Sequence, residues 1–323
     1  MAGECRSNFL KDELGFYTTS YGPFVLRSAF QPIFSQTADG RLTIEAFEAL
    51  IRANRNGQTV SPYQFFSKVD PDDAVTIDTL CRELHILNMG VLGRKKARLF
   101  INFNPALFDA VANIDAEIDR MVEITHRAGL NPSRIVCEIT EQGSGDKAVL
   151  DKLVAGLRAR LFKIAVDDFG ADDSDIQRVT DLNPDILKFD AEWVRRFTET
   201  RPGMALLKQS VKQFIDRGIT VLFEGLEEEH QITFCDEIGV QLMQGFALAR
   251  PEIVPTSFGE RFPELTREAE ANGNIRLADA PPLEPSLGMP AESPGNGPGN
   301  AAPAAKPMRS FGRRTVAFGK RTQ

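Results

Sequence analysis

The sequence has 323 residues, 42% of them hydrophobic, and a formal net charge of −7 at pH 7. That length suits one large domain or two small ones with a substantial core. No apolar run approaches the roughly 20 residues of a membrane span, and no signal peptide is recognisable, so we expect no membrane span and a cytoplasmic location. Four widely separated cysteines without a CxxC pair are typical of reduced thiols in such a protein.

Charge is distributed unevenly along the chain. Six basic residues and no acidic residue follow position 292, so residues 1–292 alone carry a net charge of −13. An acidic body is not expected to bind duplex nucleic acid. It suits a protein that concentrates carboxylates around cations.

Eight apolar, β-rich runs follow one another along the chain. They lie at residues 24–34, 44–52, 98–104, 134–141, 162–170, 185–190, 220–227 and 242–248. Apolar residues at helical spacing fill several of the gaps, at 76–93, 117–130, 147–160 and 205–218. This alternation predicts an α/β fold, a (β/α)8 barrel of the TIM type. A doubly wound open sheet has the same periodicity and remains the alternative.

Polar side chains stand at the ends of seven of these runs. They are Glu48, Asn102, Glu138, Asp167 with Asp168, Lys188 with Asp190, Glu224 with Glu227, and Gln244. The C-terminal strand ends of a barrel meet at one face, where active sites are built, so this pattern favours the barrel. Carboxylates gathered there would raise one another's pKa unless cations neutralised them.

The chemistry of these side chains predicts the cation. Oxygen donors without cysteine or histidine suit Mg²⁺ or Mn²⁺, and two such ions that share a carboxylate can clamp a phosphoester during hydrolysis. The alternative is that each acid caps a helix or lies in a solvated loop.

The chain ends in a segment of different composition. Residues 277–323 are rich in proline, alanine and glycine, which predicts a disordered tail. The tail finishes with the near-repeats FGRRT (311–315) and FGKRT (318–322). They indicate either a solvated basic end or a docking peptide for an unknown acidic or nucleic-acid partner.

Ordered short motifs accompany the eight runs. They are QPI (31–33), EAL (48–50) followed by Ile51-Arg52, SPYQFF (61–66), INFNP (101–105), CEITE (137–141), VDDFG (166–170), LKFD (187–190), FEGLE (223–227) and MQGF (243–246). With these motifs the chain resembles the EAL domain family, bacterial phosphodiesterases of cyclic di-GMP. The expected domain spans residues 24–262, after a short N-terminal segment of residues 1–23. Because that segment is too short for a sensor, a stand-alone EAL protein is expected.

The resemblance implies a modified TIM barrel whose first strand is antiparallel, with two metal ions at its C-terminal rim. Glu48, Asn102, Glu138 and Asp167 would hold one ion, and Asp167, Asp168 and Glu224 the other. Lys188, Glu224 and Glu48 would be catalytic, with Lys188 positioning or deprotonating the attacking water. Gln31, Arg52, Glu227 and Gln244 would bind substrate, and Glu141 would brace the loop after the fifth strand. The expected reaction of the homodimer is hydrolysis of cyclic di-GMP to linear pGpG.

One motif departs from the family pattern. The family usually reads DDFGTGYSSL where this chain reads DDFGADDSDI, so that three acids follow Ala171. In the family this loop couples the metal site to the dimer interface, so we expect the altered loop to affect turnover, dimer coupling or both. A cyclic di-GMP phosphodiesterase is the first hypothesis, and a binding effector that does not cleave the nucleotide is the alternative. An interaction protein acting through its tail and an enzyme for a different phosphoester are the remaining ones.

Overall fold

A computed structural model of the chain describes residues 9–108, 111, 113–139, 147–170 and 175–264. Three of the expectations above lie outside these residues: the role of Glu141, the conformation of the loop 171–174, and the tail 277–323. In the described part of the chain, no helix is long and apolar enough to cross a lipid bilayer. Cys81, Cys137 and Cys235 are buried free thiols, in line with the predicted reduced state.

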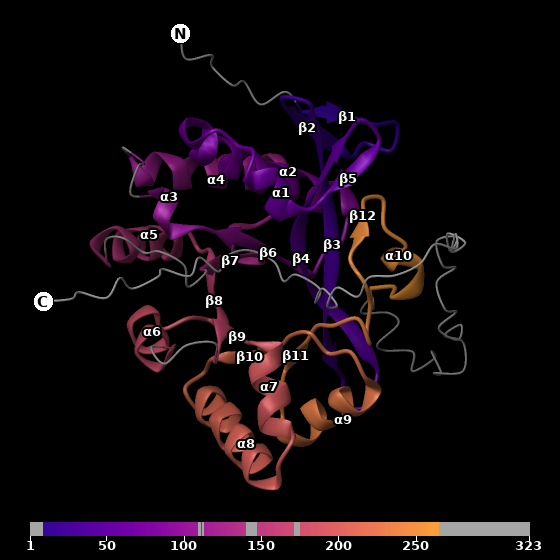
Figure 1. Cartoon of the computed structure of the whole chain (residues 1–323), viewed down its shortest axis with the longest axis vertical. Coiled ribbons are helices and arrows are strands. Elements are labelled where there is room, and N and C mark those ends of the chain that lie inside the picture. The colour runs from indigo at the N-terminus through magenta and orange to yellow at the C-terminus, as the bar shows by residue number, and fades with distance from the viewer. Residues whose placement is uncertain (1–8, 109–110, 112, 140–146, 171–174, 265–323) are drawn as a thin grey trace, which may run out of the picture. The chain divides into compact units, whose positions relative to one another are not determined.

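Eight strands close into a barrel (Figure 1). They are β3 (Phe24–Gln36), β4 (Leu42–Arg55), β6 (Arg98–Phe103), β7 (Ile135–Ile139), β8 (Lys163–Phe169), β9 (Ile186–Phe189), β10 (Thr220–Phe223) and β11 (Leu242–Met243). Strand β3 pairs antiparallel with both β4 and β11, and this double pairing closes the sheet. The other neighbouring pairs around the barrel are parallel. The predicted modified barrel is confirmed, and the open-sheet alternative is wrong.

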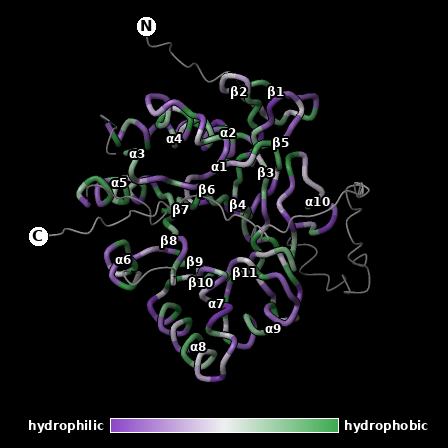
Figure 2. Tube along the Cα trace, in the orientation of Figure 1, coloured by the Kyte–Doolittle hydropathy of each residue, from purple (hydrophilic) through white to green (hydrophobic). Residues whose placement is uncertain are grey.

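Helices lie around the outside of the strands (Figure 1). The four predicted ones are α2 (Ala74–Leu92), α4 (Ile114–Arg127), α5 (Lys147–Ala159) and α8 (Arg201–Asp216). Three further helices are α6 (Asp175–Leu182), α7 (Ala191–Thr198) and α9 (Glu229–Ile238), and the short ones are α1 (Pro62–Phe66), α3 (Pro105–Phe108) and α10 (Phe258–Arg261). Hydrophobic and hydrophilic residues alternate along these helices (Figure 2), as expected where one side faces a sheet and the other faces water.

Local signals set the helix ends. The side chain of Asn113 accepts a hydrogen bond from the backbone N–H of Ala116 and so caps the start of α4. Helix α2 ends where Gly93 turns left-handed, at a φ of 74°, which glycine adopts without steric cost.

The inside of the barrel is filled by an apolar layer to which every strand contributes one residue. Its members are Ile33, Ala46, Phe100, Val136, Ala165, Ile186, Leu222 and Leu242, all fully or almost fully buried. Bulky and small residues fill the interior together, so the barrel is a packed core and not a pore.

The N-terminal segment adds strands beside the barrel. Strand β2 (Tyr17–Tyr21) pairs with β1 (Leu10–Lys11) on one side and with β3 on the other. The side chain of Asn88 in α2 accepts from the backbone N–H of Tyr17 at 2.7 Å and donates to its carbonyl at 3.0 Å. The same amide donates to Ser28, whose hydroxyl lies 2.8 Å from Nδ1 of His85. Burial lowers the pKa of His85 to about 3, so this histidine is a neutral packing residue.

The end of the described chain is fastened to the base of the barrel, at the N-terminal ends of the parallel strands. The carboxylate of Glu264 accepts hydrogen bonds from the backbone N–H groups of Lys95 and Lys96 at 2.9 and 3.0 Å. Arg94 donates to the carbonyl oxygen of Phe258 in α10. The segment that follows β12 (Glu252–Ile253) therefore closes this end of the barrel.

Replacing Glu264 by alanine should lower the free energy of unfolding by about 1 kcal/mol, because two exposed backbone donors exchange a charged acceptor for water. The exposed Glu260, whose side chain forms no hydrogen bond or ion pair with the described residues, is the matched control, and its alanine variant should stay within about 0.5 kcal/mol of the parent. Urea unfolding of the three proteins measures the difference. Equal midpoints for all three would show that Glu264 does not hold the end of the domain.

Candidate active site

A polar layer lies directly on the apolar layer of the barrel. Side chains on one face of a strand recur every two residues. Two positions beyond the apolar residue of each parallel strand, toward the C-terminal rim, stand polar residues: Glu48, Asn102, Glu138, Asp167, Lys188, Glu224 and Gln244. Strand β3 runs in the opposite direction to its neighbours, so its residue on the rim side of Ile33 is Gln31, two positions earlier in the sequence. The barrel thus brings eight predicted site residues together at one level.

Lys188 stands at the centre of this layer. Its Nζ lies 2.6 Å from Oε1 of Glu138, 2.9 Å from Oδ1 of Asp167 and 3.2 Å from Oε2 of Glu224. The Lys188 side chain is 1% exposed and that of Glu138 is fully buried. An ammonium group held by three carboxylates is a strongly coupled buried network, in which removing one member leaves a charge without its counterpart.

Burial and charge oppose each other in this network. Burial raises the pKa of Glu138 to about 8, although Lys188 opposes the shift. Burial also raises the pKa of Glu224 well above its ordinary value. Burial alone would lower the pKa of Lys188, but the neighbouring carboxylates, Asp167 first, outweigh it, so the pKa lies well above its ordinary value. Lys188 is therefore charged. Of the three carboxylates around it, Glu138 and Glu224 resist ionisation, whereas at Asp167 burial is outweighed by Lys188, which lowers the pKa of that carboxyl.

The second half of the layer opens into a hollow. Nε2 of Gln244 donates to Oε2 of Glu48 at 2.7 Å. These two residues line a hollow with about 480 Å³ of empty space, open solvent included, together with Gln31, Glu224, Gly225, Glu227, Gly245 and Phe246. Three carboxylates in this lining make the hollow a poor place for an anion unless cations accompany it.

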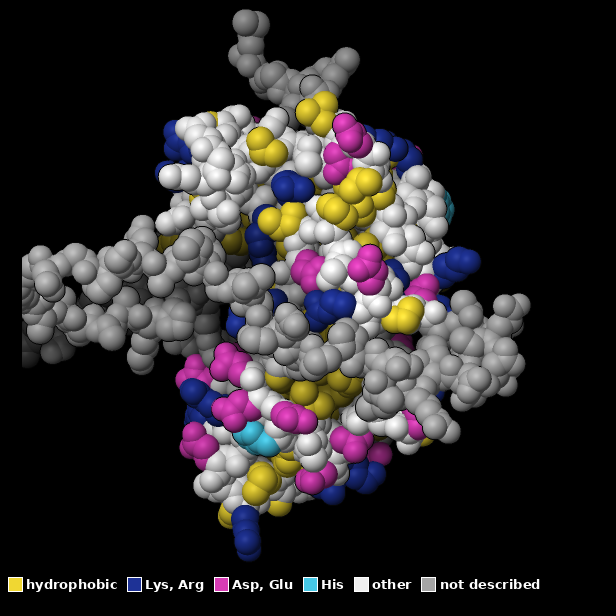
Figure 3. Space-filling model, turned by 90° about the vertical axis from the view of Figure 1, so that its right-hand side faces the viewer, with side chains coloured by type: hydrophobic (Ala, Val, Ile, Leu, Met, Phe, Trp, Pro, Cys, Tyr) yellow, Lys and Arg dark blue, Asp and Glu magenta, His cyan; other side chains and the backbone are white. Residues whose placement is uncertain are grey.

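Acidic side chains extend from the hollow onto the surface. The segment leading into α9 exposes Glu227, Glu228 and Glu229. In the view of Figure 3, acidic side chains gather on the lower part of the molecule. Part of the negative charge found in residues 1–292 therefore lies at the rim of the barrel.

The remaining predicted residues lie around the layer, of which Asn102 is an exposed member. Asp168 is also exposed and adopts a left-handed φ of 56° at an irregularity in the pairing of β8 with β9. Arg52 is half-buried, four residues beyond Glu48 on β4, and donates to the carbonyl oxygen of Ile51 at 2.9 Å. Asp190 does not join the site, because its side chain accepts from the backbone N–H groups at the start of α7 and caps that helix.

The donor set fits divalent metal ions in its chemistry. It consists of carboxylate and amide oxygens, and Oε2 of the fully buried Glu138 has no hydrogen-bond partner among the described residues. Oε1 of Gln244 is likewise buried and has no hydrogen-bond partner among the described residues. Within the described part of the chain, no three carboxylate, histidine or cysteine side chains converge closely enough to hold an ion, because the carboxylates meet at Lys188.

Two loops at the rim are locked together by close backbone approach. The N–H of Leu226 donates to the carbonyl oxygen of Gln244 at 3.1 Å, and the N–H of Ala247 donates to the carbonyl oxygen of Leu226 at 2.9 Å. A Cβ on Gly245 would lie 2.0 Å from the carbonyl oxygen of Leu226. Oε1 of Gln231 accepts from the backbone N–H groups of Glu227 and Glu228. These contacts fix the ends of β10 and β11, and the sequence alone did not reveal them.

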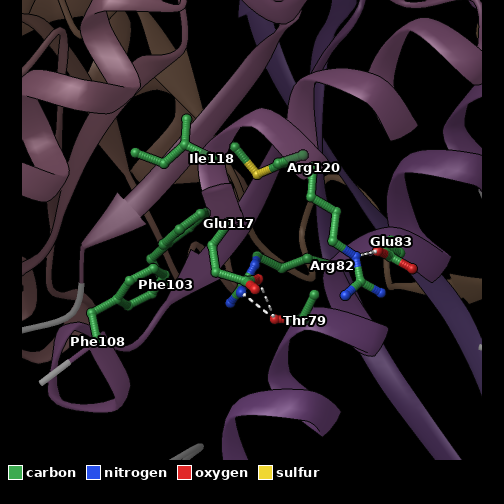
Figure 4. Close-up of a pocket in the computed structure, with 9 residues that line it drawn as sticks. Thr79, Arg82, Glu83, Phe103, Phe108, Glu117, Ile118 and Arg120 are labelled. Carbon is green, nitrogen blue, oxygen red and sulfur yellow. Dashed lines mark hydrogen bonds and ion pairs between the residues drawn. The ribbon is translucent and has the colours of Figure 1, made fainter. Parts of the chain in front are cut away.

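A second hollow lies away from this layer, beside α2 and α4 (Figure 4). The buried Arg82 lies there with its guanidinium carbon 4.5 Å from the ring centre of Phe103. It donates to Thr79 and pairs with Asp78. Its charge is therefore balanced by Asp78 and the ring of Phe103, and the hollow contains no predicted site residue.

Comparison with known proteins gives the chain's relatives. The family model described as the EAL domain matches residues 25–251, more than half of the chain. The chain is similar to the cyclic di-GMP phosphodiesterase RocR of Pseudomonas aeruginosa, with 32% identity over 124 residues that cover 38% of this chain and 31% of RocR. It is also similar to the cyclic di-GMP phosphodiesterase NbdA of that organism, with 25% identity over 232 residues, 69% of this chain and 28% of NbdA. The chain therefore spans less than a third of these curated relatives.

Solved structures show the same similarity. Klebsiella pneumoniae BlrP1, in a complex with calcium and cyclic di-GMP, gives a TM-score of 0.63 at 29% identity, over 72% of this chain and 56% of BlrP1. Its complex with manganese and cyclic di-GMP at pH 9.0 gives a TM-score of 0.64 at 27% identity, over 77% of this chain and 59% of BlrP1.

Gly245→Ala should destabilise the protein by about 1–3 kcal/mol, because the new methyl group forces the two rim loops apart. Gly259→Ala is the control, since no atom lies within 4 Å of the methyl group that it adds. Thermal unfolding of both variants beside the parent is the measurement. If the two variants had the same melting temperature, the close approach of the loops would not contribute to stability.

Proposed function

Because the chain belongs to the EAL domain family, we propose that it hydrolyses cyclic di-GMP to linear pGpG with the help of two divalent ions, Mg²⁺ or Mn²⁺. The observation that carries the proposal is the polar layer, in which each strand of the barrel supplies one residue at the same level. The relatives named above support the choice of substrate.

The proposed metal ligands are the acids of the layer and their neighbours. Glu48, Asn102, Glu138 and Asp167 would hold one ion, and Asp167, Asp168 and Glu224 the other. When bound, such ions supply a water of lowered pKa and neutralise charge on the phosphate. The partnerless buried oxygen of Glu138 supports this assignment.

Lys188 would position the attacking water and share the charge of the reacting phosphate. Of the two roles expected for it, positioning has the better support, because an ammonium group among three carboxylates keeps its proton. Glu48 and Glu224 belong to the layer and also line the hollow, so these two proposed metal ligands border the space for substrate.

Substrate would occupy the hollow above the layer. Gln31, Glu227 and Gln244 line it, and Arg52 stands farther along the wall that β4 builds. Cyclic di-GMP carries two phosphate charges, so its entry into a carboxylate-lined hollow depends on the cations. We further propose a homodimer in the cytoplasm.

A binding effector that holds cyclic di-GMP without cleaving it is the second candidate. The sequence DDFGADDSDI favours it, because three acids replace the uncharged residues that usually follow this motif in the family. Binding without formation of pGpG would identify it.

Glu48→Gln should lower kcat for cyclic di-GMP by at least about 100-fold, because the amide keeps the size of the side chain but loses a charged metal ligand. The control is Glu260→Gln, an exposed acid of α10, which should retain parental activity. Chromatographic separation of pGpG from cyclic di-GMP measures both. Full activity in Glu48→Gln would refute the assigned site.

Chelation of divalent ions should abolish hydrolysis, and Mg²⁺ or Mn²⁺ should restore it. An independent readout is thermal stability, since an ion that binds only the folded protein raises its melting temperature. This rise should disappear in Asp167→Asn and persist in Asp236→Asn, which changes an exposed acid of α9. A rise of equal size in both variants would place the ion elsewhere.

A further inference from the structure

We propose that Phe246 is a stacking platform for one guanine base of the substrate, and that Arg250 holds its ring from the opposite face. The inference rests on the proposed function and adds a specificity-determining residue to the same site. Neither residue belongs to the polar layer.

Phe246 is an exposed ring in a polar hollow. It lines the hollow beside Glu48, Glu227 and Gln244, and 49% of its surface is exposed. Among the described residues, it is the one phenylalanine that counts as an exposed large hydrophobic side chain. The other seven residues of the lining are acids, amides and glycines, so Phe246 provides the flat apolar surface of the hollow.

Arg250 contacts this ring directly. Its guanidinium carbon lies 4.3 Å from the ring centre, well within the range of a cation–π contact. A cation on one face of the ring fixes its orientation and leaves the second face for another flat group. It also brings a positive charge to a hollow that is lined by three carboxylates.

The backbone under Phe246 is held firmly. The N–H groups of Leu248 and Ala249 both donate to the carbonyl oxygen of Gly245, at 3.1 and 3.0 Å, so that Phe246 lies within a tight turn. The bond from Ala247 to Leu226 ties this turn to the loop that carries Glu227. The turn that carries the ring is therefore fixed relative to the strand ends before any ligand arrives, which reduces the ordering cost of binding.

A guanine base is the group that this surface suits. Bases stack on aromatic side chains through their flat faces, and such contacts tolerate a polar surrounding because the base edges remain hydrated or hydrogen-bonded. In a cyclic dinucleotide each base is attached, through its ribose, to the macrocycle that contains both phosphodiester bonds. A base anchored at the rim would therefore hold a phosphodiester bond above the polar layer.

The test compares two variants with the parent protein. Phe246→Leu keeps an apolar side chain but removes the ring, and Phe246→Tyr keeps the ring. Phe246→Leu should raise KM for cyclic di-GMP about 5- to 150-fold, with kcat within about 3-fold, because a base contact acts equally in the ground state and the transition state. Phe246→Tyr should behave like the parent. Ile253→Ala, an exposed apolar residue of β12, is the control for general surface effects.

A second readout does not depend on hydrolysis. In a cyclic dinucleotide with 2-aminopurine in place of one guanine, fluorescence is quenched when the probe base stacks. With Ca²⁺ in place of Mg²⁺, as in the BlrP1 complex with cyclic di-GMP, the parent and Phe246→Tyr should quench this probe, and Phe246→Leu should not.

The outcomes separate this inference from the proposed function. Parental KM and parental quenching in Phe246→Leu would overturn the platform while hydrolysis stands. Loss of quenching in Phe246→Leu, in a protein that makes no pGpG, would support the platform and refute hydrolysis. A parent protein that neither quenches the probe nor hydrolyses cyclic di-GMP would overturn both.

Discussion

The alternation of side chains along the strands is the constraint on which the site depends. Eight apolar residues fill the barrel at one level, and the next inward-facing position of each strand carries a polar residue. The polar groups therefore cannot leave the rim without the strands losing their register, and a one-residue slip would turn the apolar layer outward. The same packing that stabilises the barrel forces four carboxylates, from Glu48, Glu138, Asp167 and Glu224, into a small and partly dry space.

This enforced crowding makes charge balance the central problem of the molecule. Lys188 supplies one buried positive charge, and it contacts three of the four acids. The remaining negative charge calls for further cations or for protonated carboxyl groups, as the raised pKa values of Glu138 and Glu224 show. Binding of divalent ions would relieve this repulsion, so the features that would support catalysis also leave the metal-free protein less stable than its packing allows.

Much of this arrangement could be predicted from the sequence, because each strand is apolar up to a polar end. Eight strands and four helices were found where periodicity placed them, and the polar ends marked the rim. Periodicity alone could not distinguish a closed barrel from an open sheet, and it was the polar strand ends that favoured closure. The role of Asp190 was also hidden, because a carboxylate after a strand looks the same whether it faces the site or caps α7. Strands β1 and β2 were missed because their few residues are held by Asn88, a contact across 71 positions. The exposed ring of Phe246 depends on the close approach of two loops at Gly245, which no local pattern reveals.

The long strands β3 and β4 extend one side of the barrel beyond the polar layer. Strand β4 continues from Glu48 to Arg55, beyond the level of the polar layer, and pairs there with β3 and β5 (Gln58–Val60). Arg52 lies four residues past Glu48 on the same face, which places its backbone about 13 Å farther along the strand. Phe246 lies on the turn after β11, and β11 pairs with β3 on the side away from β4. A ligand that contacted both Arg52 and Phe246 would have to carry negative charge near the β4 wall and present a flat base beside β11. A cyclic dinucleotide meets both requirements, whereas a small phosphoester would occupy only the polar layer.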